Sequence, residues 1–136
     1  MEEESHMSDK EIVKTDNAPA PGGWYSQAVK SLPFVFVSGC VAADPKTGKL
    51  VAPGNMAVQT EQVMKNLAAI LEAGGASMAD VVKTTVFVDD IGKFGEFNEV
   101  YRRFFPKDPP ARSTVQVGKF MPGMCIEVEA IARVER

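Results

Sequence analysis

The stretch Val81–Val88, which reads VVKTTVFV, decides the fold that we expect for this chain. β-Branched residues occupy six of its eight positions, and this composition is typical of a β-strand. A continuous run of this kind favours a strand that is covered on both faces and therefore lies in the interior of a sheet.

Helical patterns lie on both sides of this strand. Over residues 55–73 apolar residues recur at helical spacing along one face, and Gly74-Gly75 then provides a C-terminal cap. Asp89-Asp90 caps a second predicted helix, Ile91–Phe105, with aromatic residues at helical spacing: Phe94, Phe97, Tyr101 and Phe104. This aromatic stripe predicts packing into the core rather than a cofactor site.

Five further strands are predicted towards the two ends of the chain: Glu11–Thr15, a segment near Ala28–Lys30, Phe34–Cys40, Ser113–Val117 and Cys125–Val134. The order strands, helix, strand, helix, strands predicts an α+β sandwich of two layers, with two helices on one face of a mixed six-stranded sheet. Gly39 marks either a β-bulge or a point where a ligand or another backbone comes close.

Composition restricts the class of protein. The chain has 136 residues, which suit one domain, and its hydrophobic and charged fractions of 45% and 24% are ordinary. No apolar run approaches the roughly 18 residues of a membrane span, and no secretory signal pattern opens the chain. Cys40 and Cys125 are the only cysteines, too few for a disulfide framework, so we expect a reducing, cytoplasmic location.

The first six residues, Met1–His6, are interpreted as a cloning remnant, which leaves residues 7–136 as the single domain. The remnant contains three glutamates, and without them the net charge changes from −3 to 0. A near-neutral chain argues against nucleic acid or an anionic membrane as partner. His6 is the only histidine, which argues against Ser-His-Asp and Cys-His nucleophile arrangements and imidazole-based zinc sites.

Pro109–Thr114, which reads PPARST, is the first candidate for a functional stretch. Its two prolines make a turn that places Arg112 at the entrance of a strand. A planar guanidinium there is suited to binding a carboxylate or phosphate through two parallel hydrogen bonds; the alternative is a surface arginine beside a turn. Trp24 and Tyr25, which follow a Pro- and Gly-rich loop, fit either core packing or the lining of a cleft.

Alternation along the last two strands predicts what each face of the sheet carries. Ile126, Val128, Ala130 and Ala132 are expected to face the helices, with Glu127 and Glu129 on the opposite face. Val115 and Val117 are also assigned to the helix side, with Arg112, Thr114 and Gln116 opposite. A hairpin register that keeps like faces together places Arg112 about 13 Å from Glu127. If both residues serve one small ligand, they come from different chains, which predicts an oligomer with sites between subunits.

The sequence resembles the RidA (YjgF-like) family of reactive intermediate imine/enamine deaminases. The resemblance runs from about Ile12 to the C-terminus and rests on four motifs in order: Tyr25–Ala28 (YSQA), Val82–Val88 (VKTTVFV), Pro110–Val115 (PARSTV) and Ile126–Ala132 (IEVEAIA). It implies a chorismate-mutase-like fold, a homotrimer and ligand clefts between subunits. It also implies cofactor-free hydrolysis of 2-aminoacrylate and 2-iminobutanoate to 2-keto acids and ammonia, the activity of a 2-iminobutanoate/2-iminopropanoate deaminase.

The resemblance also implies roles for individual residues. Arg112 matches the arginine that binds the substrate carboxylate, and Glu127 matches the glutamate that orients or activates the attacking water. Four further positions match residues that line the cleft and contact the substrate: Tyr25, Gly39, Asn98 and Thr114. No metal or other cofactor is implied, because a protonated imine is already electrophilic.

Two positions depart from the family pattern. Many relatives have Gln where this chain has Cys40, and many have Cys where it has Thr114. Cys40 is either a reactive thiol beside the cleft or a small buried residue. Two other functions remain as alternatives: an RNA-directed role, since some relatives have been described as endoribonucleases or translation inhibitors, and a non-catalytic oligomer that binds small carboxylates.

Overall fold

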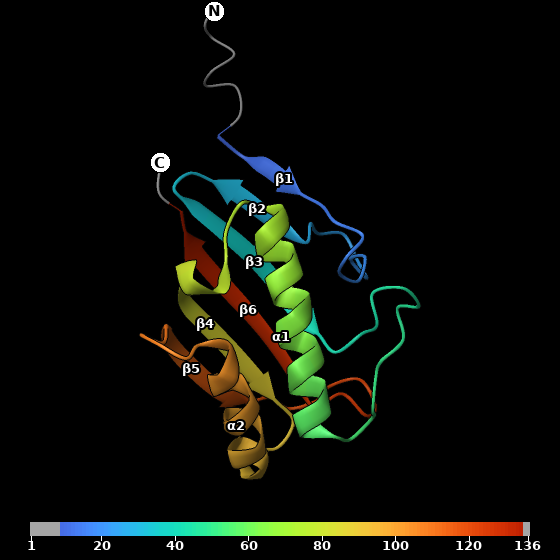
Figure 1. The fold of residues 1–136 in the computed structure, drawn as a ribbon. Coiled ribbons are helices and arrows are strands. Elements are labelled where there is room, and N and C mark those ends of the chain that lie inside the picture. Colours follow the sequence, from blue (N-terminus) through green and yellow to red (C-terminus); the bar gives the residue numbers. More distant parts are fainter. Residues whose placement is uncertain (1–8, 135–136) are drawn as a thin grey trace, which may run out of the picture.

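Six strands form one mixed sheet, and both long helices cover the same face of it (Figure 1). The structure is a computed structural model in which residues 9–134 are described; the predicted remnant Met1–His6 lies outside them. The strands are β1 (Glu11–Val13), β2 (Ala28–Ser31), β3 (Phe34–Val41), β4 (Val81–Val88), β5 (Ala111–Gln116) and β6 (Ile126–Arg133). The helices are α1 (Met56–Ala73) and α2 (Phe94–Phe104), with short 3₁₀ turns η2 (Met78–Asp80) and η3 (Ile91–Lys93). The predicted two-layer architecture is confirmed.

The strand order is β1-β2-β3-β6-β4-β5, and only β4 and β5 run parallel. The predicted hairpin between the last two strands is therefore wrong, because β4 lies between β5 and β6. A parallel pair needs a crossover connection, and η3 and α2 provide it on the way from β4 to β5. The chain then passes the end of β4, where the Val117 N–H donates to the Val88 carbonyl at 2.9 Å.

The core lies between the sheet and the two helices. On α1, Val63, Leu67 and Leu71 are fully buried against it. The side chains of β6 alternate as predicted, with buried residues towards the helices and Glu127 and Glu129 on the other face. That other face is not covered by any described element, so β4 lies inside the sheet but is not buried on both faces as predicted.

The faces predicted for β5 are inverted. Arg112 pairs with Thr84 and Val115 with Phe87, and paired residues of neighbouring strands point to the same face. Thr84 is buried under the helices, so Arg112 also lies on the helix side, and Val115 lies on the open face with 44% of its surface exposed. The apolar residues of this edge strand therefore lie on the open face of the sheet, which is itself partly apolar.

Gln59 on α1 connects the loops at one end of the sheet. The side chain is fully buried; its amide nitrogen donates to the carbonyls of Val51, Ala52 and Gly123, and its oxygen accepts from the Cys125 N–H at 2.8 Å. A buried backbone group without a partner costs free energy, and these hydrogen bonds join the loop at residues 51–52 to the segment 123–125.

Replacing Gln59 by Leu keeps the apolar volume and removes these hydrogen bonds. We expect the free energy of unfolding to fall by about 2–4 kcal/mol, measured by chemical denaturation. Gln62→Leu is the control, since it removes a single 2.9 Å hydrogen bond to Asn66 from a partly exposed position, and we expect it to cost less than about 1 kcal/mol. Equal losses in the two variants would contradict this role of Gln59.

No helix within residues 9–134 combines the length and the hydropathy that a membrane span requires.

Candidate active site

Arg112 lies in a cradle of side chains from α2. Its Nη1 donates to the Asn98 Oδ1 at 2.9 Å, and its guanidinium carbon lies 5.3, 5.3 and 4.8 Å from the ring centres of Phe94, Phe97 and Tyr101. A guanidinium at these distances is attracted by the aromatic faces. The cradle therefore restrains the guanidinium, although Arg112 remains partly exposed beside the turn.

The cradle is itself fixed to the sheet. The Tyr101 hydroxyl and the Thr84 Oγ1 lie 2.7 Å apart, within hydrogen-bond distance, and both side chains are buried. Burial raises the pKa of Tyr101 above its ordinary value, so the phenol stays protonated, and either hydroxyl can donate in this hydrogen bond. Thr84 is also the residue that pairs with Arg112 across the two parallel strands. Contacts at Thr84 therefore fix both β5, which carries Arg112, and α2, which carries Tyr101, relative to β4.

Arg112 lines an open groove of about 790 Å³ between α2 and the turn before β5. The other residues of the groove are Asn98, Glu99, Tyr101, Arg102, Arg103, Phe105, Pro106, Pro109 and Pro110. Thr114, two residues beyond Arg112 on the same strand, shares its face and is partly buried. Arg112, Asn98 and Thr114 therefore form one group, suited to a small anion.

Glu127 forms the centre of a second group. It lies on the open face of the sheet and next to Gly39, where a register shift between Val37 and Cys40 confirms the predicted β-bulge. A Cβ atom at Gly39 would lie 2.8 Å from the Glu127 carboxyl carbon, so the close neighbour here is a side chain and not the ligand or backbone of the second alternative. Burial raises the pKa of Glu127, and the negative charge of Glu129 raises it further.

Tyr25 belongs to the side of the molecule that carries Gly39. Both residues line a small pocket of about 50 Å³ that also includes Cys40. The Tyr25 hydroxyl accepts a hydrogen bond from the Gly22 N–H at 3.1 Å, and half of its surface is exposed. Trp24 is fully exposed. Core packing is therefore the wrong alternative for both aromatic residues.

The two groups are too far apart to meet within one chain. Arg112 on β5 pairs with Thr84 on β4, which in turn pairs with Ala130 on β6. Glu127 therefore lies two strands across from Arg112, about 10 Å, and three residues along the strand, about another 10 Å. The two side chains also lie on opposite faces of the sheet. One small ligand cannot contact both residues of the same chain.

Cys40 is buried, with 6% of its surface exposed. Burial, assisted by the charge of Glu127, raises the pKa of the Cys40 thiol to about 12. A thiol with this pKa stays protonated near neutral pH and is a weak nucleophile. Of the two alternatives for Cys40, the small buried residue fits the structure.

The role of the aromatic stripe of α2 was only half predicted. Phe97 and Tyr101 are buried, as expected for core residues, but the same rings also hold Arg112. The signal in the sequence was an arginine shortly after an aromatic helix, but the alternation of side chains along the predicted strand placed that arginine on the wrong face of the sheet.

No group of three or more His, Cys, Asp or Glu side chains within the described residues could hold a metal ion.

Comparison with known proteins identifies the family. The family model described as Endoribonuclease L-PSP matches residues 15–134. A RutC family protein of Pyrococcus horikoshii is 47% identical, over 93% of this chain and 99% of the relative. The 2-iminobutanoate/2-iminopropanoate deaminase of Rattus norvegicus is 45% identical, over 90% of this chain and 89% of the relative. The crystal structure of RidA from an Antarctic Psychrobacter matches with a TM-score of 0.87 and 40% identity, over 91% of this chain and 99% of that one.

The fold defines a class of α+β proteins in which two helices cover one face of a mixed six-stranded sheet. The chain belongs to the RidA (YjgF-like) family, which the matching model describes as Endoribonuclease L-PSP.

Gly39→Ala tests the contact between the bulge and Glu127. The added methyl group would overlap the carboxylate, so we expect the Glu127 side chain to move and the free energy of unfolding to fall by about 1–3 kcal/mol. Thermal denaturation and a crystal structure of the variant measure both effects. Gly95→Ala is the control, because a Cβ there meets no atom within 4 Å and α2 should gain about 0.5–1 kcal/mol. An unmoved Glu127 in the Gly39 variant would contradict the assignment.

Proposed function

We propose that this protein hydrolyses reactive imino and enamino acids, such as 2-iminobutanoate and 2-aminoacrylate, to 2-keto acids and ammonia. The observation that carries the proposal is Arg112, held by three aromatic rings and Asn98 at the side of a groove. A fixed guanidinium suits a carboxylate, which these substrates share. Membership of a family that includes a rat 2-iminobutanoate/2-iminopropanoate deaminase supports the same reaction.

In the proposed reaction Arg112 binds the substrate carboxylate, and the protonated imine carbon is attacked by water. Glu127 accepts a proton from this water while the oxygen bonds to carbon and the C=N π electrons move to nitrogen. The proton then passes from Glu127 to the nitrogen, and the C–N bond breaks as the hydroxyl oxygen forms the carbonyl. Glu127 accepts the hydroxyl proton in this step and passes it to the departing ammonia, which leaves as ammonium, so that the carboxylate is regenerated. One water is consumed for each keto acid and ammonia released. The raised pKa of Glu127 supports this role, because a carboxyl group whose pKa is nearer to neutral pH both accepts and donates protons more readily.

The proposal includes a homotrimer with sites between subunits. It is supported by the separation of Arg112 from Glu127 within one chain. The open face of the sheet supports it as well, because Phe36 and Val115 each expose 44% of their surface there. Phe36 pairs with Ile131 and Val115 pairs with Phe87, and both partners are partly exposed. Apolar surface exposed on one face in this way is typical of an interface. Tyr25, Gly39 and Glu127 of one chain then complete the site of a neighbour that supplies Arg112, Asn98 and Thr114.

Substitution of the two proposed catalytic residues tests the reaction. We expect Arg112→Ala to lower kcat/KM for 2-iminobutanoate about a hundredfold, because a charge-assisted contact to the carboxylate is lost, and Glu127→Gln to lower kcat. An amino-acid dehydratase generates the imine in place, and release of 2-oxobutanoate is measured. Lys46→Ala, which removes an exposed lysine from the turn after β3, is the control. A parent protein no faster than buffer would contradict the proposal and favour non-catalytic carboxylate binding.

Mixing these two inactive variants tests the intersubunit site. When Arg112→Ala and Glu127→Gln chains are refolded together, some sites combine an intact arginine from one chain with an intact glutamate from another. Random assembly should restore about a quarter of the parental activity. If the mixture stays as inactive as its components, the site does not lie between subunits.

Glu129→Gln tests the pH dependence. Removing the negative charge of Glu129 removes one of the two causes that raise the pKa of Glu127, so that pKa should fall. The base form then persists to lower pH, and the acidic limb of the pH profile of kcat/KM should shift to lower pH. Glu72→Gln on α1, far from Glu127, is the control. Equal shifts in both variants would mean a general charge effect.

The name of the matching family model keeps an RNA-directed role as the second candidate. The near-neutral chain and its single histidine, His6, argue against this role. Salt-dependent RNA binding by the parent protein would favour it.

A further inference from the structure

The groove beside Arg112 is larger than a four-carbon imino acid requires. Its volume of about 790 Å³ lies within the range of roughly 300–1,000 Å³ that holds drug-sized ligands. Beyond Arg112, two further arginines of α2, Arg102 and Arg103, line it, and Glu99 is the one acidic residue among the lining side chains. The groove therefore carries an excess of positive charge in a chain whose full sequence has a net charge of −3.

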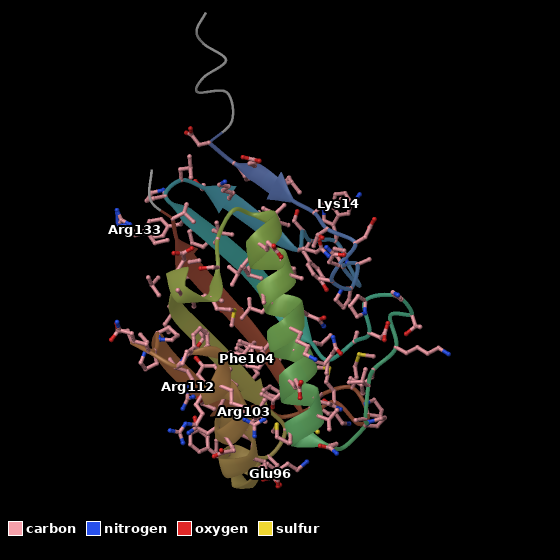
Figure 2. All side chains as sticks on the ribbon, in the orientation of Figure 1. Lys14, Glu96, Arg103, Phe104, Arg112 and Arg133 are labelled. Carbon is pink, nitrogen blue, oxygen red and sulfur yellow. The ribbon has the colours of Figure 1, made fainter. Side chains whose placement is uncertain are left out.

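Arg102 lies in line with the residue that contacts Arg112. Asn98, which accepts the hydrogen bond from Arg112, is four residues before Arg102 on α2, and residues four apart lie on one helix face with Cβ atoms about 5–6 Å apart. Figure 2 shows Arg103 on α2 and Arg112 on β5 at the same side of the molecule, and both line the groove. Arg102 and Arg103 therefore lie within the same groove as Arg112.

Among the described residues no acidic side chain forms an ion pair with Arg102 or Arg103. Within residues 9–134 the ion pairs join Lys65 to Glu61 and Lys93 to Asp89, so Arg102 and Arg103 retain their charge for a ligand. Both lie in the last turn of α2, where cations also interact favourably with the helix dipole. A role in helix stability and a role in binding predict different results, because only the second depends on which ligand is present.

We propose that Arg102, assisted by Arg103, forms a second anion position that selects imino acids with a carboxylate at the far end of the side chain, as formed from acidic amino acids. This inference rests on the proposed function, since Arg112 must hold the first carboxylate. In 2-iminoglutarate three carbon atoms separate the two carboxylates, so the second one lies next to the first within the groove. Arg102 and Arg103 are then specificity-determining residues of the same site.

The test compares ligands of equal chain length that differ in the second carboxylate. Binding of 2-oxoglutarate and of 2-oxopentanoate is measured by calorimetry, and hydrolysis is measured with the imines that amino-acid oxidases form from glutamate and norvaline. The parent should prefer the dicarboxylic member of each pair. Arg102→Gln should reduce that preference about three- to tenfold, with the loss falling mainly on 2-oxoglutarate and 2-iminoglutarate. Arg103→Gln should give a smaller loss in the same direction.

Controls separate the second anion position from other effects. Lys46→Gln changes the net charge equally at a turn outside the groove and should leave both ratios unchanged. Thermal denaturation of the arginine variants shows any loss of helix stability, which would not change a ratio between two ligands. Unchanged ratios in the double variant, with 2-iminopentanoate still hydrolysed, would overturn this inference and leave the proposed function intact. A parent that neither binds 2-oxopentanoate nor hydrolyses either imine would overturn both.

Discussion

The parallel pairing of β5 with β4 is the constraint on which the candidate site depends. Parallel neighbours need a crossover, and this one carries α2 over the face that Arg112 shares with Thr84. The hydroxyls of Thr84 and Tyr101 meet there at 2.7 Å, so the register of the strands and the rotation of the helix are fixed together. An antiparallel hairpin in place of this crossover would leave Arg112 without its cradle.

The aromatic residues of α2 link the core to the site. Phe97 and Tyr101 are buried and hold the helix on the sheet, while their faces, with that of Phe94, also meet the guanidinium of Arg112. An arginine held in this way has already lost side-chain freedom, so less is lost when a ligand binds. The rigidity of the core is thereby transmitted to a residue on an edge strand.

Much of the fold follows from local patterns, and the relation between distant strands does not. The helices, the six strands, the bulge at Gly39 and the two faces of β6 follow from hydrophobic periodicity and glycine. The partner of β5 does not, because a short connection such as residues 118–124 serves a hairpin or a passage across the end of β4 equally well. The face of Arg112 was missed for a related reason: Val115 is apolar but points to an open face that also carries Phe36, so apolar character does not identify the helix side. The separation of Arg112 from Glu127 was nevertheless expected, although the argument used the wrong pairing.

Under the proposed function, association of chains and completion of the site are a single event. Arg112 and Glu127 lie on opposite faces of one sheet, and no small movement within the chain brings them together, because a slip of one residue would turn every side chain of a strand to the other face. A second chain can supply the missing half without such a slip. The contact also covers part of the open face, where Phe36 and Val115 are exposed, and burial of apolar surface is favourable at about 25 cal/mol per Å². Under the proposed function, the apolar residues that a single chain leaves exposed on this face therefore favour the assembly that completes the site.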